Sequence, residues 1–414
     1  MRQEESDRPD RQSYDRMDRG PAGDGGPPRF LRWLVVVLGV VLTVRFGPVA
    51  FSGREAPAYY RGDETKVAYL LHGAGRDLLT LVQPERFYGT KVEAKNRFHT
   101  GSARFDGEWF FGTFLMTVVG ASQTAIEHPD LAADSRDVTH LGEETLVAPQ
   151  TRAYDTEAWS EDALDHLEGS SRDHCAYLCY VAFGLGMARL AEPKFAYGEL
   201  HDRVIATLER RMLAKESLLL QTYPGETYPV DNAMFIGALG LHAQATGTDH
   251  HVLLERWEAK ARATMLDPAT GLLVQSMKDD GTPGDRARGS GTALASYALS
   301  YALPALSKDL WTSIRTHLWV SVLGFGAIRE YARKDQGRGD VDSGPVIFGL
   351  GISSAGFALG AARANKDEQA FRGLYASAHF MGAPIDGDAR RNYVTGGPIG
   401  QAILFAMMTA RRAP

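Results

Sequence analysis

The chain has 414 residues, of which 44% are hydrophobic, 10% aromatic and 23% charged, and its formal net charge is −6. These proportions are typical of a globular protein and exclude a wholly disordered or fibrous chain. There is no basic excess and no stripe of Lys and Arg with interleaved aromatic residues, so we expect no nucleic-acid partner. The two cysteines, Cys175 and Cys179, are too few for a disulfide framework or a four-ligand zinc site, and we expect them to be small buried core residues.

The N-terminal part divides into three segments. Residues 1–29 mix Arg with Asp and Glu and are rich in Gly and Pro, which predicts a disordered charged tail. Residues 30–51 are apolar apart from Arg32 and Arg45, which favours a signal-anchor or transmembrane segment over a cleaved signal peptide or a buried helix. Residues 52–64 are expected to be a linker, and either signal reading places residues 65–414 outside the cytoplasm, in the periplasm or at the cell surface.

From residue 65 onward, apolar residues recur at three- and four-residue spacings, which predicts an all-α domain. The expected helices lie near 65–83, 107–128, 137–148, 173–192, 196–215, 229–247, 250–266, 288–306, 307–321, 342–366, 367–381 and 396–412.

The twelve predicted helices are of two kinds that alternate along the chain. One kind is rich in Gly, Ala and Ser and apolar on nearly every face, as in residues 232–241, so protein must surround it. The other is amphipathic and charged, as in residues 197–211. Six buried helices, each paired with an exposed one at a period above 50 residues, predict an (α/α)6 toroid, with an open solenoid as the alternative.

Long polar loops precede the last four of the small-residue helices. If these helices form an inner ring, their starting ends and the loops before them gather at one end of the toroid. Helix N-termini offer free N–H groups and a positive dipole end, and loops commonly carry function. We therefore expect the functional site at that end.

The stretch 222–232, Thr-Tyr-Pro-Gly-Glu-Thr-Tyr-Pro-Val-Asp-Asn, is the strongest candidate for chemistry. Pro229 suits the first turn of a helix, which places Asp231 in that turn, where it is either a catalytic acid or base or a helix-terminal carboxylate. Four neighbours are expected to bind substrate: Tyr223, Glu226, Tyr228 and Asn232.

Other candidates also open predicted inner helices. His174 and Asp342 are expected to be catalytic, and Asp173 and Glu108 to bind substrate. The alternatives are a structural residue for His174, a helix cap for Asp342, and a carboxylate that complements the helix dipole for Glu108. The sequence lacks the His-Glu-x-x-His zinc motif, the dinucleotide-binding glycine motif and a phosphate-binding loop, so we expect neither a metal nor a cofactor.

Residues from about 108 to 408 resemble the linalool dehydratase-isomerase family of (α/α)6 barrels. Four segments carry the resemblance, in order along the chain: Asp173-His-Cys-Ala-Tyr-Leu-Cys-Tyr, Tyr228-Pro-Val-Asp-Asn-Ala-Met-Phe, Leu266-Asp-Pro-Ala-Thr-Gly-Leu-Leu and Asp340-Val-Asp-Ser-Gly. The resemblance implies cofactor-free acid–base elimination or migration of a hydroxyl group on a small terpenoid alcohol.

Carried over by position, His174 matches an active-site His of that family, and Asn232 matches an Asn that follows a catalytic Cys. That Cys is Asp231 here, the second catalytic Cys falls at Thr222 and its neighbouring Glu at Tyr223. An active-site Tyr of the family falls at Thr292. These differences make the site more polar and more acidic than the family's own.

The leading expectation is therefore an extracytoplasmic dehydratase-isomerase-like enzyme that acts on a hydroxylated small molecule. Two alternatives stay open, because enzymes and binding proteins that act on sugars also use carboxylates and aromatic loop residues. One is a glycan-active hydrolase, lyase or epimerase of the cell envelope. The other is a noncatalytic protein that binds a glycan or lipid. The sequence does not predict an oligomeric state.

Overall fold

The computed structural model describes residues 29–83, 98–192, 194–333, 335, 337, 339 and 344–411. The chain divides into two compact units, Met1–Gly47 and Pro48–Pro414. The described part of the first unit lies in helix α1 (Arg29–Gly53), whose side chains from Phe30 onward are mostly exposed and apolar. By length and composition alone, two segments of the described chain could cross a membrane. One is Phe30–Arg61, whose most apolar stretch is exposed, and the other is Ala103–Glu127, which is mostly buried in the second unit.

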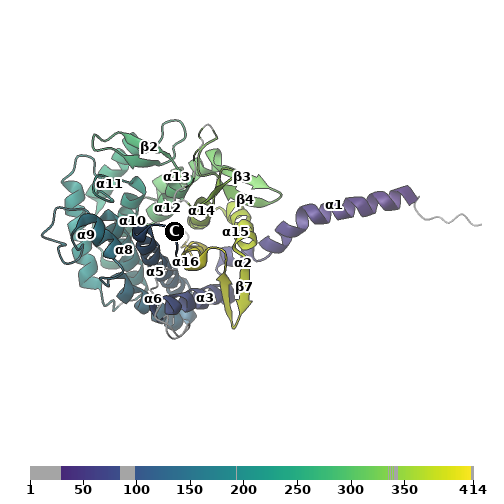
Figure 1. The fold of residues 1–414 in the computed structure, drawn as a ribbon, viewed down its shortest axis with the longest axis horizontal. Helices are drawn as coiled ribbons and strands as arrows, with labels where there is room; N and C mark the ends of the chain where they lie inside the picture. The colour runs from purple at the N-terminus through teal and green to yellow at the C-terminus, as the bar shows by residue number, and fades with distance from the viewer. Residues whose placement is uncertain are drawn as a thin grey trace, which may run out of the picture. The chain divides into compact units, whose positions relative to one another are not determined.

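Six helices form a closed inner ring in the second unit (Figure 1). Each packs against the next in chain order, and the last packs against the first. These helices are α5 (Ala103–Glu127), α8 (Cys175–Ala191), α10 (Pro229–Thr246), α12 (Gly289–Leu299), α14 (Ile352–Ala364) and α16 (Gly397–Met408). The closure of this ring confirms the predicted toroid and excludes an open solenoid.

A second set of six helices lies outside this ring. It comprises α3 (Glu64–Val82), α6 (Ala132–Leu146), α9 (Gly198–Leu213), α11 (His251–Lys260), α13 (Pro304–His317) and α15 (Glu368–Gly382). The helix α11 continues as one π-helical turn, η3 (Ala261–Met265). Each of the twelve predicted helices thus has a counterpart, and the charged, amphipathic ones are the outer helices.

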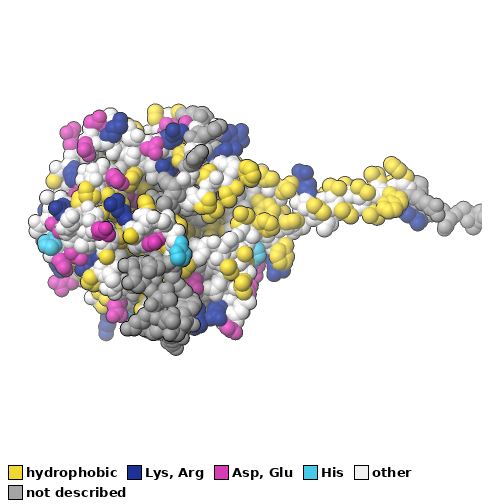
Figure 2. All heavy atoms as spheres, viewed as in Figure 1, with side chains coloured by type: hydrophobic (Ala, Val, Ile, Leu, Met, Phe, Trp, Pro, Cys, Tyr) yellow, Lys and Arg dark blue, Asp and Glu magenta, His cyan; other side chains and the backbone are white. Residues whose placement is uncertain are grey.

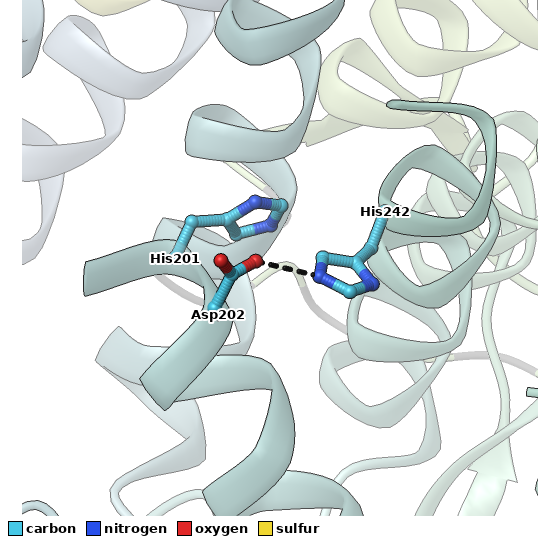
Figure 3. Close-up of side chains that lie close together, drawn as sticks. All are labelled: His201, Asp202 and His242. Carbon is cyan, nitrogen blue, oxygen red and sulfur yellow. Dashed lines mark hydrogen bonds and ion pairs between the residues drawn. The ribbon is translucent and has the colours of Figure 1, made fainter. Parts of the chain in front are cut away.

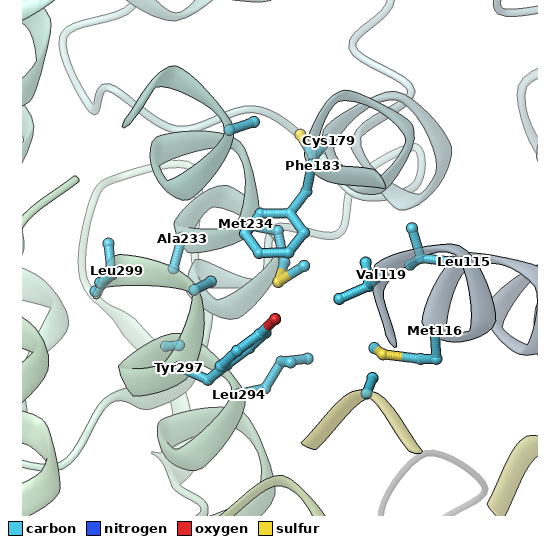
Figure 4. Packing of buried hydrophobic residues seen from close by; sticks show 14 of the residues in the cluster. Leu115, Met116, Val119, Cys179, Phe183, Ala233, Met234, Leu294, Tyr297 and Leu299 are labelled. Carbon is cyan, nitrogen blue, oxygen red and sulfur yellow. The ribbon is translucent and has the colours of Figure 1, made fainter. Parts of the chain in front are cut away.

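Glycine allows the inner helices to approach one another closely. A Cβ atom built on Gly237 would lie 2.5 Å from the carbonyl oxygen of Ala298, and one on Gly240 would lie 2.3 Å from that of Tyr301. Larger side chains fill the ring where the backbones diverge, and Figure 4 shows Phe183 and Tyr297 extending from α8 and α12 toward each other. Their ring centroids are 5.9 Å apart.

Four two-stranded antiparallel hairpins occupy segments that we expected to be loops or helix. They are β1 (Val274–Met277) with β2 (Pro283–Ala287), β3 (Trp319–Val322) with β4 (Phe325–Ile328), β5 (Val346–Ile347) with β6 (Leu350–Gly351), and β7 (Pro384–Gly387) with β8 (Arg390–Tyr393). The prediction of a helix over 342–366 was therefore wrong before Ile352, because the chain first forms β5 and β6 and only then turns into α14.

Within the described residues, three short helices were not predicted: α2 (Ala56–Arg61), η2 (Pro129–Leu131) and α7 (Ala153–Trp159). The helix α2 lies inside the segment 52–64 that we expected to be a linker. Its Tyr59 is fully buried and stacks on Tyr375 of α15, with ring centroids 5.0 Å apart. This segment therefore belongs to the second unit and packs against α15.

The cysteines lie where we expected them, fully buried in the first turns of α8. They also form a disulfide, Cys175–Cys179, which the sequence analysis did not foresee. The bond links residues four apart on one helix, so it closes only a short loop and does not connect different elements.

Candidate active site at the rim of the inner ring

The starts of the inner helices and the segments before them form the rim of the toroid. Backbone hydrogen bonds join neighbouring segments: the Cys175 amide donates to Gln221 O at 3.2 Å, Met277 to Thr227 O at 2.9 Å, and Gly289 to Glu330 O at 2.8 Å. Segments that are 41–50 residues apart in the chain thus lie side by side at one end of the ring, as the alternation of helices predicted.

Among the site residues that we expected on α10, Asp231 is the carboxylate, and it is buried at the rim. Its side chain is 7% exposed in the first turn of that helix. The Tyr180 hydroxyl donates to Oδ1 at 2.7 Å and the Thr222 hydroxyl to Oδ2 at 2.6 Å. Burial raises the pKa of Asp231 from 3.8 to about 6, although the two hydrogen bonds act in the opposite direction. Asp231 can therefore exchange a proton near neutral pH, as a general acid or base requires.

A second carboxylate reaches the same part of the rim from α5. The Tyr223 hydroxyl donates to Glu108 Oε2 at 3.0 Å. Burial and the charge of Glu108 raise the pKa of Tyr223, so the phenol stays protonated. The exposed Arg104 lies over the Tyr223 ring, 5.0 Å from its centroid. Because Thr222 and Tyr223 are consecutive, Asp231 and Glu108 are connected through two adjacent side chains.

His174 lies at the start of α8, but its partners are not those expected from the sequence. Its ring is 1% exposed, with Nδ1 2.7 Å from Asp155 Oδ2 and Nε2 3.4 Å from Glu161 Oε1. Trp159 lies against it at a centroid distance of 5.0 Å. Burial raises the pKa of Asp155, whereas its hydrogen bond to His174 lowers it. The structure thus pairs His174 with carboxylates from α7 and the following turn, and not with Asp231.

Asp173 and Asn232, which we expected to bind substrate, hold the chain that leads to Thr222. Asp173 Oδ2 accepts from the Gln221 amide at 2.8 Å and from the ammonium group of Lys215. Asn232 Oδ1 accepts from the Leu220 amide at 2.7 Å, and its Nδ2 donates to Leu220 O at 3.0 Å. Both residues are almost fully buried, so their contribution is to position the segment that carries Thr222 and Tyr223.

Glu226 and Tyr228 lie on the outer side of the same segment. The Tyr228 hydroxyl donates to Glu226 Oε2 at 2.9 Å, and Glu226 is exposed. These side chains are accessible from solvent and could contact a ligand that approaches Asp231. Asp342, which we expected to be catalytic, lies outside the described residues.

Another buried carboxylate, Glu330, lies at the rim between α12 and α14. Its Oε1 accepts from the Ser290 hydroxyl at 2.6 Å, and its Oε2 accepts from the Ser354 hydroxyl. Ser290 and Ser354 belong to the first turns of the two helices, so Glu330 ties their starts together. Sequence reasoning placed Glu330 on a loop without giving it a role.

Histidines cluster at the opposite end of the ring (Figure 3). His201, Asp202 and His242 each offer one donor atom, and these atoms lie within 4.8 Å of one another. Asp202 and His242, together with His250, border a pocket of about 330 Å³. The Arg189 guanidinium pairs with Asp202, however, and His242 Nε2 lies 2.9 Å from the same Asp202 oxygen. A cation there would face this guanidinium, so we assign the cluster to an ion-paired network rather than to a metal site.

Comparison with protein-family models finds no match to the sequence, and comparison with curated proteins finds none either. Among solved structures, the GH76 α-mannanase of Bacteroides thetaiotaomicron matches with a TM-score of 0.50 and 12% identity, over 82% of this chain and 94% of its own. An inactive variant of an α-1,6-mannanase of Salegentibacter sp. in complex with α-1,6-mannotriose gives a TM-score of 0.48 and 10% identity, over 83% and 98%. A D-mannose isomerase gives 0.41 and 11%, over 79% and 96%. The likeness to the GH76 α-mannanase supports the toroid and, at this identity, shows the fold alone.

Proposed function

We propose that this chain is a glycan-active enzyme that uses Asp231 as its general acid or base and Glu108 as its second carboxylate. The observation that carries the proposal is that the donors to these two carboxylates, Thr222 and Tyr223, are consecutive residues on one segment of the rim. The two carboxylates come from α10 and α5, and the hydrogen bonds of Thr222 and Tyr223 connect them. Enzymes that cleave glycosidic bonds commonly use two carboxyl groups in this way.

The environments of the two carboxylates differ, which allows them to take different roles. Asp231 is buried and its pKa is raised to about 6, so a substantial fraction carries a proton in mildly acidic solution. It is suited to protonate the oxygen of a leaving sugar. Glu108 is only half-buried and accepts a hydrogen bond from Tyr223, so it is suited to stabilise positive charge on the sugar or to activate water.

The fold of the GH76 α-mannanase supports this proposal at the level of analogy only. It favours the glycan alternative over the dehydratase-isomerase reading that the sequence resemblance suggested. That reading needs His174 to act together with Asp231, whereas His174 contacts Asp155 and Glu161. The linalool dehydratase-isomerase assignment stays a prediction from sequence.

A substrate screen with matched variants tests the proposal. The full-length protein in detergent is incubated with α-linked mannan oligosaccharides, other polysaccharides and hydroxylated terpenoids, and products are identified by mass spectrometry. We expect a glycan to be turned over, and Asp231→Asn and Glu108→Gln to reduce the rate by roughly 10²–10⁴-fold. Asp279→Asn, on the exposed turn between β1 and β2, is the control and should keep full activity.

Three outcomes would contradict the proposal. Glycan turnover that survives Asp231→Asn would remove the role assigned to this residue. Conversion of a terpenoid alcohol without action on any glycan would support the dehydratase-isomerase prediction instead. Glycan binding without any turnover would instead favour the noncatalytic alternative.

We further propose that α1 anchors the enzyme in a membrane with the barrel outside the cytoplasm. The support is a helix of 25 residues, Arg29–Gly53, whose apolar side chains are exposed along most of its length. About 20 apolar residues suffice to cross a bilayer. Resistance of the protein to extraction from membranes by alkaline carbonate is the expected result. Its release as a soluble protein would refute the anchor.

A further inference from the structure

Six apolar side chains remain exposed on β3, α15, β7 and the adjoining turns. Each is between 40% and 63% exposed: Val322, Leu323, Phe380, Met381, Ile385 and Val394. We name this set the apolar patch, and Figure 2 shows hydrophobic side chains gathered over β3, β4 and α15. Soluble monomers rarely leave large apolar side chains exposed in one contiguous area, and such areas commonly mark an interaction surface.

The members of the apolar patch are connected by direct contacts. Val322 pairs with Phe325 across the β3–β4 hairpin, and the Phe325 ring lies 5.6 Å from the Phe380 ring at the end of α15. The Thr395 hydroxyl, next to Val394, donates to Met381 O at 2.5 Å. The chain runs from α15 through Ala383 directly into β7, which carries Ile385. The six side chains therefore belong to one surface rather than to scattered positions.

The last turns of α1, which belong to the same compact unit, border this surface. A Cβ atom built on Gly324, at the tip of the β3–β4 hairpin, would lie 3.0 Å from Val49. The Phe51 ring is 59% exposed and lies 6.1 Å from His379, the neighbour of Phe380. Arg54 lies over the same Phe51 ring at 4.8 Å. The end of α1, from Val49 to Phe51, thus lies beside the apolar patch.

We propose that the apolar patch docks on the surface of the lipid bilayer that holds α1. The inference rests on the membrane anchor proposed above. The chain would leave the bilayer at Phe51 and Arg54. Because Val49 and Phe51 lie beside the apolar patch, the patch would then lie close to the lipid headgroups. Exposed aromatic and aliphatic side chains beside an arginine match the composition of the membrane interface, where rings and guanidinium groups lie at headgroup depth.

Docking has a consequence for the site because the hairpins of the patch belong to the rim. The β3–β4 hairpin leads within two residues to Glu330, and β7–β8 leads within four residues to the start of α16. A bilayer seated on the patch therefore brings this side of the rim next to the headgroup layer. The substrate class that fits this arrangement is a glycan attached to the membrane rather than a free sugar in solution.

A depth measurement on the full-length protein tests the docking. Ile385→Cys is labelled with an environment-sensitive fluorophore, and the protein is reconstituted into phosphatidylcholine vesicles. The native cysteines are buried and joined in a disulfide, so they do not take the label. Val252→Cys is the matched control, because Val252 is a 55% exposed apolar residue on α11, outside the patch. Equal melting temperatures of both labelled variants verify that the fold is kept.

We expect the label at position 385 to shift to shorter emission wavelengths and to lose intensity when nitroxide-bearing lipids are added. The label at position 252 should show neither change. Protein that floats with the vesicles while both labels behave as in water would overturn the docking but leave the anchor intact. Protein that does not float with the vesicles would overturn the anchor itself. A blue shift at position 385 without quenching by lipid nitroxides would show that a second copy of the chain covers the patch, which also overturns the proposal.

Discussion

Replacing Asp231 by Asn is expected to stabilise the folded protein at neutral pH while strongly reducing its proposed activity. Burial raises the pKa of this carboxyl from 3.8 to about 6 in the folded state, whereas the unfolded chain keeps the ordinary value. A carboxyl whose folded pKa is raised contributes its full stability only below the unfolded pKa, and that contribution is lost as the pH rises through the folded pKa. A shift of this size corresponds to about 3 kcal/mol of destabilisation above pH 7.

The asparagine variant removes this cost because an amide does not ionise. Its side chain can still accept from Tyr180 and donate to Thr222, the two groups that contact Asp231 in the native protein. The two proteins should therefore differ little in stability at low pH, and the variant should gain as the pH increases between the two pKa values.

Urea unfolding of the barrel, followed by tryptophan fluorescence in detergent, measures this difference. We expect a gain of about 3 kcal/mol for Asp231→Asn at about pH 8 and little difference at about pH 4. Asp279→Asn, at an exposed position, should show no comparable dependence on pH. A variant that is less stable than the native protein at about pH 8, or a difference that does not change with pH, would refute the assignment of Asp231 as a buried carboxyl with a raised pKa.

Three further predictions follow from the same structure. Thr222→Val removes a hydrogen bond to the charged form of Asp231. A carbon NMR titration should therefore find the pKa of this carboxyl raised by roughly one to two further units. An unchanged pKa would contradict this role of Thr222. Burial raises the pKa of Glu143 to about 8, so Glu143→Gln should stabilise the barrel by a few kcal/mol, roughly, above pH 8 but not below pH 4.5, and an equal effect in both ranges would refute this cause. Gly240→Ala places a Cβ 2.3 Å from a backbone carbonyl oxygen and should lower the free energy of unfolding by about 1–3 kcal/mol, measured by thermal unfolding. Its control, Gly400→Ala, meets nothing within 4 Å and should raise the free energy of unfolding by about 1 kcal/mol. The reverse order would show that the inner helices are not closely packed.

The sequence by itself determined the helices and their division into two rings. Apolar and small residues on every face of a segment such as 232–241 require that protein surround it, and charged residues on one face of 197–211 require water there. Both requirements follow from local periodicity, which is why α10 and α9 appear where they were predicted. The hairpins before α12, α14 and α16 escaped the same reasoning, because strands of two to five residues leave too short a pattern.

Only the tertiary structure decided which side chains meet at the rim. Sequence placed Asp231 and His174 at helix starts but gave no sign that Tyr180, one helix away, donates to Asp231, or that Asp155 from the unpredicted helix α7 holds His174. A helix start can be recognised from a few adjacent residues, since its capping preferences are local. The partner of a buried carboxylate depends instead on how neighbouring helices pack, and it sets both the desolvation and the hydrogen bonds from which the pKa follows.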